Sequence, residues 1–516
     1  MSETPSETHR WHAAIAALWD RRTLTLFFLG MSAGLPLLLI FSTLSIWLTE
    51  AGVPRADVTF FSWAALGYGF KFVWAPLVDR IPLPVLGRRR SWLLLAQVSV
   101  AAALIGMGLT DPAEQPVIMA LWAVMLGFSA ATQDIVIDAY RIEIAEPAIQ
   151  AMLSAAYIGG YRVGMILAGA GALEIAGLLD SAPDGYDYAS WRATYLVMAA
   201  TMGLGVITTL LAREPDLRLD NGQHGPGDYA RFFLLFLLAV LAFVVVFSAW
   251  SRFAMPLSEG LSAALGPVGG FLSGALQLGL AVAAAVLAGW GGMRARIAPR
   301  DLVIDGYVSP FRDFVGRFGG IAVSLLCLIA LYRMADVVMG VVANVFYTDL
   351  GFEKEEIGRI TKLFGLVVTI LGGFVGGILT IRFGVFRILF LGALLSAATN
   401  ILFAFLATRG ADTVFLAMAV SADNLSAGLA SAAFVAFLSS LTDVRFTAMQ
   451  YAMISSLMLL VPKLVGGYSG AMVDAAGYEM FFIGTAIVGL PVCALVLRVA
   501  RHPAFRASGE GTDATN

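Results

Sequence analysis

Charged side chains are scarce in this sequence. Asp, Glu, Lys and Arg make up 13% of its 516 residues, whereas soluble domains carry roughly 25%. Hydrophobic residues account for 59%, and the mean hydropathy is +0.82. A soluble globule of this length would expose more surface than so few charges can cover. The composition therefore excludes a soluble multidomain enzyme and predicts an integral membrane protein.

Cysteine, histidine and basic runs are also in short supply. The two cysteines, Cys327 and Cys493, lie in apolar runs, so they offer neither a disulfide framework nor a metal-binding cluster. The four histidines fall outside the apolar runs, which argues against a membrane-embedded enzyme with a nucleophile–base pair. A net charge of −3 without any basic tract predicts no nucleic-acid partner. We expect no cofactor, no metal and no catalytic residue.

Long apolar runs dominate what is present. A helix needs about 20 mostly apolar residues to cross the hydrocarbon core of a bilayer. Fourteen runs qualify, in groups of six, two and six: 24–48, 58–79, 91–109, 117–140, 149–176, 192–212; 232–250, 266–290; 320–347, 357–381, 388–407, 413–440, 447–474 and 478–499. Two groups of similar length indicate a duplicated bundle of the kind that transporters use. We predict an all-α membrane protein with two six-helix bundles and an extra two-helix hairpin.

The loops set the domain order and the orientation. We predict the following parts: a cytoplasmic segment 1–23 with an interfacial helix near 11–19, a first bundle 24–212, a linker 213–319 with the hairpin 232–290, a second bundle 320–499 and a disordered cytoplasmic tail 500–516. Arg and Lys gather in the loops on the side of the termini, which places both termini in the cytoplasm. The charges within the spans are scattered and form no ring, which disfavours a channel.

Nine ionisable side chains fall inside the predicted spans. They are Lys71, Asp134, Asp138, Arg162, Arg333, Asp336, Lys362, Asp423 and Lys463. Each costs about 2.5–3.5 kcal/mol near the centre of a membrane helix. We therefore expect most of them to pair or to line a hydrated cavity between the bundles.

Three of the cations are predicted to bind an anionic substrate. Lys71 and Arg162 lie too deep to reach the interface easily, and Arg333 adds a third positive charge. Arg333 can instead pair locally with Asp336, three residues away on the same helix. Lys362 lies near the start of its helix and can extend to the interface.

The strongest local cluster runs from Gln133 to Arg141. Asp134 and Asp138 are four residues apart and share a helix face, with Arg141 one turn further on. Two neighbouring carboxylates favour protonation and arginine opposes it, so the pair is a candidate proton-coupling site. The alternative is a structural ion pair between Asp138 and Arg141. The expected sugar or amide contacts are Gln133, Tyr157 and Tyr161.

Two further features are basic turns at the cytoplasmic side and pairs of glycines on helix faces. The residues predicted to form a cytoplasmic gate are Asp79, Arg80, Gly87, Arg88, Arg89 and Arg141. The glycine pairs predicted to let helices approach closely are Gly160 with Gly164, Gly372 with Gly376, and Gly373 with Gly377.

Several motifs resemble those of one transporter family. The matching stretches include Gly34–Leu37, Lys71–Arg80, Gly87–Trp92, Gln133–Arg141, Gly160–Gly164, Lys362–Gly365 and Gln450–Leu457. In these the chain is similar to AmpG-type muropeptide permeases of the major facilitator superfamily. Asp336 and Asp423 match no motif of that family.

The resemblance implies a secondary active transporter, not an enzyme. It implies proton-coupled import of anhydromuropeptides (GlcNAc-anhydroMurNAc with or without a stem peptide) across the bacterial inner membrane, for peptidoglycan recycling and with a link to β-lactamase induction. The expected partners are this anionic glycopeptide, protons and membrane lipid, and the expected state is a monomer. The alternative is a proton-linked permease for another anionic metabolite, such as acetyl-CoA or a nucleotide derivative.

Overall fold

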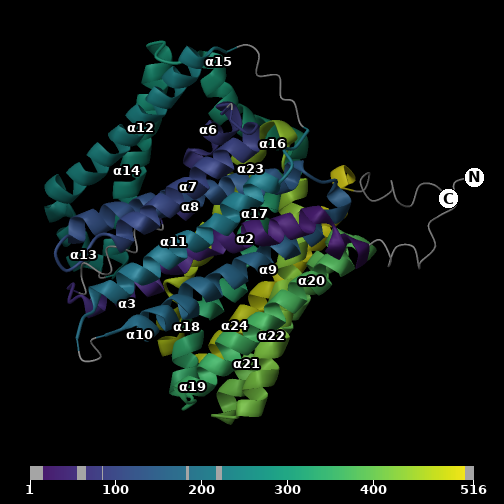
Figure 1. Cartoon of the computed structure of the whole chain (residues 1–516). Coiled ribbons are helices and arrows are strands. Elements are labelled where there is room, and N and C mark those ends of the chain that lie inside the picture. The colour runs from purple at the N-terminus through teal and green to yellow at the C-terminus, as the bar shows by residue number, and fades with distance from the viewer. Residues whose placement is uncertain are drawn as a thin grey trace, which may run out of the picture. The chain divides into compact units, whose positions relative to one another are not determined.

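The fold is known from a computed structural model that describes residues 15–54, 66–83, 85–181, 185–216, 224–265 and 267–505. Helices account for nearly all of these residues, and no strand occurs among them (Figure 1). This follows from the composition, because a lipid-embedded backbone must satisfy its own N–H and C=O groups and a helix does so within one segment.

Thirteen helices in the described part of the chain are long and apolar enough to cross a membrane. They coincide with thirteen of the fourteen predicted runs. The remaining run, 58–79, has residues 58–65 outside the described part. Residues 11–14 of the predicted interfacial helix near 11–19 also lie outside it, whereas Ala17–Trp19 form a short 3-10 helix. Most of the C-terminal tail, residues 506–516, lies outside the described part as well.

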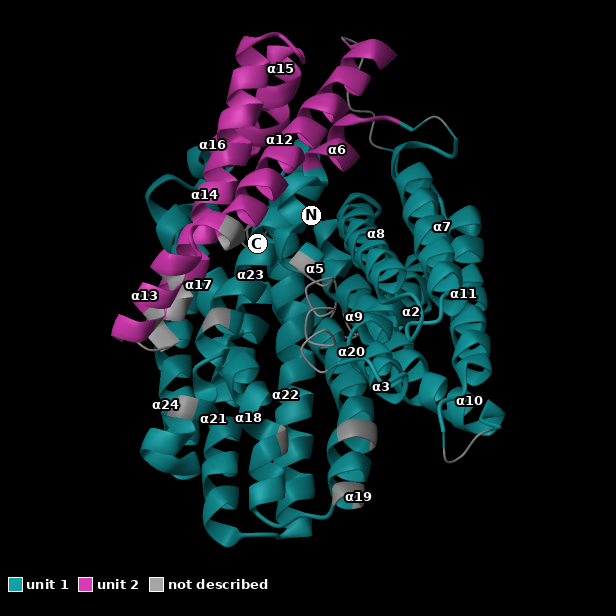
Figure 2. Cartoon of the chain, turned by 90° about the vertical axis from the view of Figure 1, so that its left-hand side faces the viewer, with its two compact units in different colours: residues 1–75, 83–217, 314–516 teal, residues 76–82, 218–313 magenta. Residues whose placement is uncertain are grey.

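The chain forms two compact units (Figure 2). Unit 1 comprises residues 1–75, 83–217 and 314–516, and unit 2 comprises residues 76–82 and 218–313. The finer division into two bundles, a linker and two terminal segments stays a prediction. We call residues 1–75 and 83–217 of unit 1 the first half and residues 314–516 the second half.

The helices of unit 1 are bounded as follows. The first half contains α2 (Arg21–Ile40), α3 (Ser42–Glu50), α5 (Leu66–Phe70), α7 (Arg88–Gly108), α8 (Pro116–Glu143), α9 (Gln150–Ile166), α10 (Ala172–Leu179) and α11 (Tyr188–Leu211). The second half contains α17 (Ala322–Leu331), α18 (Met334–Asp349), α19 (Lys354–Ile357), α20 (Gly365–Phe383), α21 (Val385–Arg409), α22 (Thr413–Ser440), α23 (Thr447–Gly466) and α24 (Ser469–Ala500).

The first membrane helix of each half is interrupted. Between α2 and α3, Phe41 has φ −95° and ψ −91°, five residues after Pro36, which has no N–H to donate. Between α17 and α18, Arg333 has φ −101° and ψ 7°. Broken membrane helices place helix ends and polar groups in the interior, where transporters build their ligand sites. The break in the second half coincides with a cation that the sequence singles out.

Glycine lets α2 and α9 pack backbone to backbone (Figure 1). A Cβ atom at Gly160 would overlap the carbonyl oxygen of Phe27, and one at Gly34 would overlap that of Tyr161. Gly30 and Gly164 are equally constrained. Close helix approach at Gly160 and Gly164, predicted from the sequence, is thus confirmed, and it fixes the backbone that carries Tyr157, Tyr161 and Arg162.

Replacing Gly160 with alanine should therefore impair folding. We expect Gly160→Ala to lower the yield of monodisperse protein several-fold, because the added methyl group forces the two helices apart. Gly203→Ala is the matched control, since a Cβ atom there meets nothing within 4 Å. Size-exclusion chromatography of fluorescently tagged variants measures the difference. Equal yields for the two variants would contradict the close packing.

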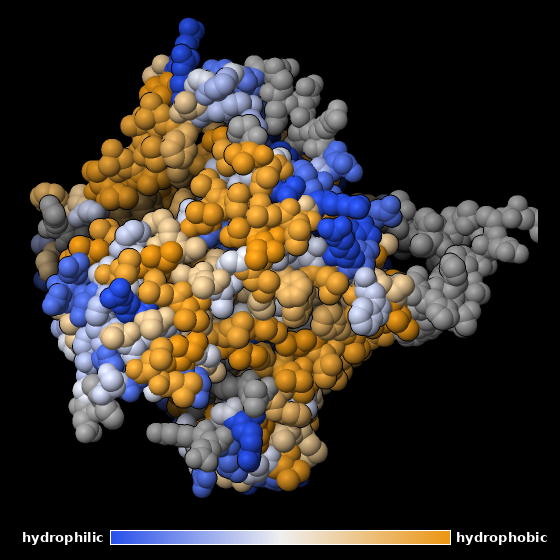
Figure 3. All heavy atoms as spheres, viewed as in Figure 1, coloured by the Kyte–Doolittle hydropathy of each residue, from blue (hydrophilic) through white to orange (hydrophobic). Residues whose placement is uncertain are grey.

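Apolar side chains also cover the outside of the protein. Leu121, Leu211 and Val323 are 66%, 65% and 70% exposed. Figure 3 shows hydrophobic residues over much of one face. Exposed apolar surface of this extent suits contact with lipid chains rather than with water. Inside the second half, aromatic clusters around Phe437 and around Phe482 form the packed core.

Unit 2 is built around a helical hairpin. It contains α12 (Pro226–Phe253), α13 (Met255–Leu265), α14 (Pro267–Arg294), α15 (Arg300–Val303), most of α6 (Ala75–Arg80) and the first part of α16 (Ser309–Phe318). The Gln277 side chain on α14 donates to the carbonyl of Phe247 on α12 at 3.0 Å. The two long helices, α12 and α14, contain candidate membrane spans at the positions predicted for the hairpin.

Candidate functional site

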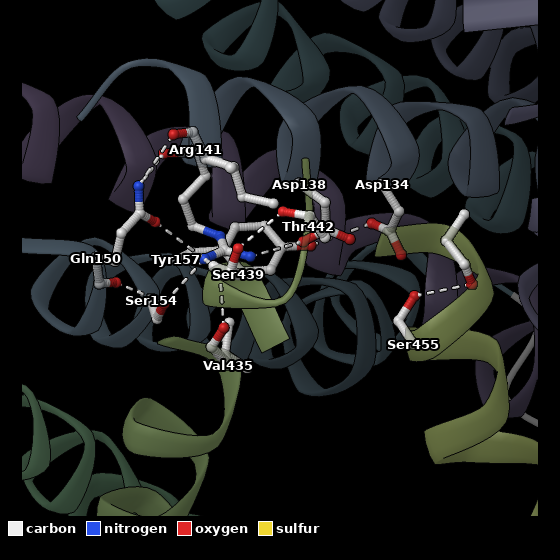
Figure 4. A network of polar contacts seen from close by, with 12 residues as sticks. Asp134, Asp138, Arg141, Gln150, Ser154, Tyr157, Val435, Ser439, Thr442 and Ser455 are labelled. Carbon is white, nitrogen blue, oxygen red and sulfur yellow. Dashed lines mark hydrogen bonds and ion pairs between the residues drawn. The ribbon is translucent and has the colours of Figure 1, made fainter. Parts of the chain in front are cut away.

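A buried charge cluster sits on α8. Asp138 lies 3.5 Å from the Arg141 guanidinium (Figure 4). It also lies 3.3 Å from the Lys71 ammonium. The three side chains are at most 9% exposed. The ion pair between Asp138 and Arg141, an alternative left open by the sequence, is confirmed, and Lys71 joins it from 67 residues away. In this conformation Lys71 compensates a carboxylate, and its predicted contact with a substrate stays a prediction.

Asp134 differs from its neighbour. Its carboxylate accepts a hydrogen bond from the Tyr157 hydroxyl at 3.3 Å, and among the described residues no cation lies within 4.0 Å of it. Asp138 is thus held by two charges and Asp134 by one hydroxyl. The two neighbouring acids therefore differ in their partners, and the proton-coupling role predicted for the pair stays a prediction.

Arg141 connects the two halves. Its guanidinium donates to Ser154 on α9 at 3.0 Å and to Ser439 on α22 at 2.8 Å (Figure 4). It also lies 5.1 Å from the centre of the Tyr451 ring on α23. Ser154 belongs to the same half as Arg141, so the contacts with Ser439 and Tyr451 are the ones that must be lost if the halves separate here. The gate role predicted for Arg141 is supported by this position and stays a prediction.

A second contact between the halves involves α9 and α20. A Cβ atom at Gly377 would lie 3.3 Å from the Cβ atom of Ala155 and 3.3 Å from the Cα atom of Met152. Gly377 is close to the end of α20, and Ala155 is close to the start of α9. Together with Arg141, these residues define what we call the seam, where α8 ends and α9 begins.

Two arginines from different halves, Arg162 and Arg333, lie close enough for electrostatic repulsion. Arg333 lies 3.2 Å from Asp336 and donates to Ser431, so the local pairing that the sequence left open is confirmed. Arg162 is half-buried and has neither a carboxylate nor a hydrogen-bond partner among the described residues. Its guanidinium is close enough to Arg333 for their charges to repel. An uncompensated cation beside a second arginine is an arrangement that binds carboxylate or phosphate.

The other predicted substrate contacts are less uniform. Tyr157 and Tyr161 are half-buried, with ring centres 6.0 Å apart. Gln133 is fully buried, and its amide donates to Ser32 on α2 at 2.8 Å. Gln133 is therefore inaccessible to a substrate in this conformation. Its substrate contact, like those of the tyrosines, stays a prediction.

The predicted gate turn is organised by two acids that sequence reasoning missed. Glu143 is fully buried and lies 2.7 Å from Arg88 and 2.6 Å from Arg89. Glu214 accepts the backbone N–H groups at the start of α7, at 2.7 Å from the nitrogen of Arg89. Anionic groups at a helix N-terminus are stabilising. Both acids stand next to loop arginines in the sequence, and only that proximity hinted at a role.

Gly87 and the remaining gate residues are also located. Gly87 precedes α7 with φ +109°, a value that favours glycine, and a Cβ atom there would lie 2.6 Å from the Glu214 side chain. Asp79 and Arg80 belong to unit 2, where Arg80 donates to the carbonyl of Asp305 at 2.8 Å. Their roles in gating stay predictions.

Glu143 should be a major source of stability. We expect Glu143→Gln to lower the free energy of unfolding by about 3–5 kcal/mol, because it leaves buried Arg89 without its carboxylate. Thermal denaturation of the detergent-solubilised protein measures this loss. Glu114→Gln, at an exposed position in a loop, is the control and should leave the melting temperature unchanged. An unchanged melting temperature in Glu143→Gln would contradict the buried pairing.

Comparison with known proteins places this geometry in a family. Residues 23–332 match the family model of the Major Facilitator Superfamily, which is more than half of the chain. The chain therefore belongs to the major facilitator superfamily and is a membrane protein. Two of its relatives are named as a putative transporter and a permease, and the chain is a transporter rather than an enzyme.

Two relatives and two solved structures illustrate the match. The chain is 29% identical to the putative transporter AmpG 4 of Rickettsia conorii, over 93% of this chain and 96% of that protein. It is also 29% identical to the anhydromuropeptide permease of Escherichia coli, over 92% and 79%. The proton:xylose symporter XylE bound to 6-bromo-6-deoxy-D-glucose superposes with a TM-score of 0.60 at 13% identity, over 92% and 94%. FucP in the outward conformation superposes with a TM-score of 0.57 at 11% sequence identity, over 93% of this chain and 98% of that chain. These structures confirm the predicted major facilitator fold.

Proposed function

We propose that the protein imports anhydromuropeptides from the periplasm to the cytoplasm of a bacterium, driven by protons. The observation that carries this proposal is Arg162, a cation without a described partner that faces Arg333 from the opposite half. A muropeptide supplies carboxylates for such a pair and sugar faces for the nearby tyrosines. The name of the Escherichia coli relative supports the same substrate class.

The proposed orientation places both termini in the cytoplasm of an inner-membrane protein. The excess of Arg and Lys in loops on that side supports it. The seam then lies at the cytoplasmic end, so the halves are in contact there and the protein is in an outward-facing state. Alternating access requires the seam to open and the other end to close around the substrate.

Proton coupling is proposed for the Asp134 and Asp138 pair. A proton that moves inward across a 100 mV potential supplies about 2.3 kcal/mol. The single hydroxyl contact of Asp134 supports a role for this acid in carrying the proton, and the two-cation pairing of Asp138 supports a role in holding Arg141 at the seam. The protein is proposed to act as a monomer, with lipid as its surroundings.

Uptake into proteoliposomes tests the proposal. Purified protein should accumulate labelled GlcNAc-anhydroMurNAc-peptide when an inward proton gradient is imposed, and accumulation should collapse with an uncoupler. Unlabelled muropeptide should compete, whereas acetyl-CoA and nucleotides should not. Competition by acetyl-CoA or a nucleotide alone would replace the substrate with that anionic metabolite. Accumulation that ignores the uncoupler would remove proton coupling.

A further inference from the structure

The second half contains a carboxylate pair that the proposed function does not use. Asp336 on α18 and Asp423 on α22 are close enough for their charges to interact. The Ser396 hydroxyl donates to Asp336 at 2.5 Å, and the Thr399 hydroxyl donates to Asp423 at 3.1 Å. Both donors lie on α21, three residues apart, so one helix face holds the two acids together.

The two acids are compensated unequally. Asp336 has Arg333 at 3.2 Å. Among the described side chains, the Thr399 hydroxyl is the hydrogen-bond partner of Asp423, and no cation lies within 4.0 Å of the carboxylate. The pattern repeats that of Asp138 and Asp134 in the first half, where one acid binds cations and the other binds a hydroxyl.

The groups around Asp423 are few. Within the described chain, the charged or titratable groups that interact electrostatically with Asp423 are Asp336, Arg333 and Tyr347. On α20, Thr369 bonds to Asn424 instead. The side chain of Lys362, in the π-helical segment before α20, lies outside the described set.

A second observation points to a ligand at this pair. Asn400 on α21 is completely buried, and neither its amide nitrogen nor its carbonyl oxygen has a hydrogen-bond partner in the described chain. It lies one turn after Ser396, four residues further along α21, and therefore shares a helix face with the side chain that donates to Asp336. A buried amide with free donor and acceptor atoms can hold the water through which a proton reaches a carboxylate.

Depth separates the two carboxylate sites. The helices α8 and α22 both have 28 residues, and each is the fourth span of its predicted bundle, so both run in the same direction. Asp423 lies about 15 Å from the start of α22 and Asp134 about 27 Å from the start of α8, at 1.5 Å per residue. In the proposed orientation Asp423 is nearer the periplasm, on the side away from the seam.

Charge balance links this site to the substrate. In the absence of substrate, the net charge of the site is zero, because the two arginines Arg162 and Arg333 balance the two carboxylates of Asp336 and Asp423. A substrate carboxylate that docks between the arginines adds one negative charge, and leaving it uncompensated in the membrane interior is costly. A proton on Asp423 restores neutrality without breaking the pair of Arg333 with Asp336.

We propose that Asp423 is a second proton-binding carboxylate, loaded from the periplasmic side when an anionic substrate group docks at Arg162 and Arg333. The proposal rests on the proposed function and extends it. The step is a proton transfer: an O–H bond of a hydronium ion on the periplasmic side breaks as one forms on the Asp423 carboxylate, and the reverse transfer to water releases the proton on the cytoplasmic side.

Two measurements test this role. The first adds the anhydromuropeptide to detergent-solubilised protein in weak buffer and follows the pH. Wild-type protein should take up protons on binding, and Asp423→Asn should lose about one proton of this uptake per substrate bound. Asp474→Asn, an exposed acid on α24, is the matched control and should behave like the wild type.

The second measurement separates coupling from binding. In proteoliposomes, Asp423→Asn should lose gradient-driven accumulation at least tenfold but keep exchange of internal for external muropeptide, and Asp423→Glu should regain part of the accumulation. Loss of both accumulation and exchange would assign Asp423 to binding or structure and overturn the proposal. Unchanged accumulation would also overturn it while leaving the proposed function intact. Failure of wild-type protein to transport muropeptide would instead reject the proposed function.

Discussion

The Ala155→Cys/Gly377→Cys double variant should stop transporting when it is oxidised and recover when it is reduced. A Cβ atom at Gly377 would lie 3.3 Å from that of Ala155, close to the 3.5–4.5 Å usual in a disulfide. A shift of a few tenths of an ångström therefore suffices for bond formation. Because the two residues belong to opposite sides of the seam, the disulfide holds the halves together where they must part.

The variant belongs in a background without Cys327 and Cys493, so that no other thiol reacts. Labelled muropeptide uptake by oxidised protein should fall to the level of empty liposomes, and dithiothreitol should restore it. The two single-cysteine variants, treated in the same way, should be unaffected by oxidant. Full transport by protein that is demonstrably cross-linked would mean that the seam does not open during the cycle.

The sequence predicts contacts between residues close together in the chain better than contacts between distant segments. The spans follow from local hydropathy, and the pairings of Asp138 with Arg141 and of Arg333 with Asp336 follow from helical spacing, because residues three apart share a face whatever the fold. Thirteen predicted spans and both pairs are found in the structure.

Contacts between distant segments are harder to predict. Arg141 bonds to Ser439, 298 residues away, and nothing near either residue in the sequence announces the other. Serine is common in membrane helices, so its partner emerges only when the halves are packed. Its depth alone predicts that Lys71 lines a cavity. In the structure, the segment after α5 packs beside α8, and the Lys71 ammonium lies 3.3 Å from the Asp138 carboxylate.

Glu143 was missed for a related reason. It follows Arg141 at the end of α8, where the sequence pattern indicates a solvated loop. Its burial depends on the glycine turn at Gly87, which aims Arg88 and Arg89 at it from the start of α7. Likewise, the interruption at Arg333 has no proline or glycine beside it, so only the backbone reveals that a cation stands at a helix break.

Replacing Arg162 with glutamine should abolish most transport without destabilising the protein. A charge-assisted hydrogen bond contributes about 1.5–3 kcal/mol, so losing the one to the substrate should lower binding about 10- to 100-fold. The free protein has no described partner for Arg162, and a neutral side chain also removes the repulsion by Arg333. The melting temperature of substrate-free Arg162→Gln should therefore equal or exceed that of the wild type.

Arg141→Gln is the informative contrast. Arg141 is fully buried and bound to Asp138 and to Ser439, so its removal leaves partners unsatisfied and should lower the melting temperature. Muropeptide binding, uptake and thermal denaturation of both variants separate the two kinds of arginine. Removing a cation that stabilises the fold lowers the melting temperature, whereas removing a cation that binds the ligand lowers only binding and uptake. Equal destabilisation in the two variants, or normal uptake by Arg162→Gln, would show that Arg162 is structural and that the anion binds elsewhere.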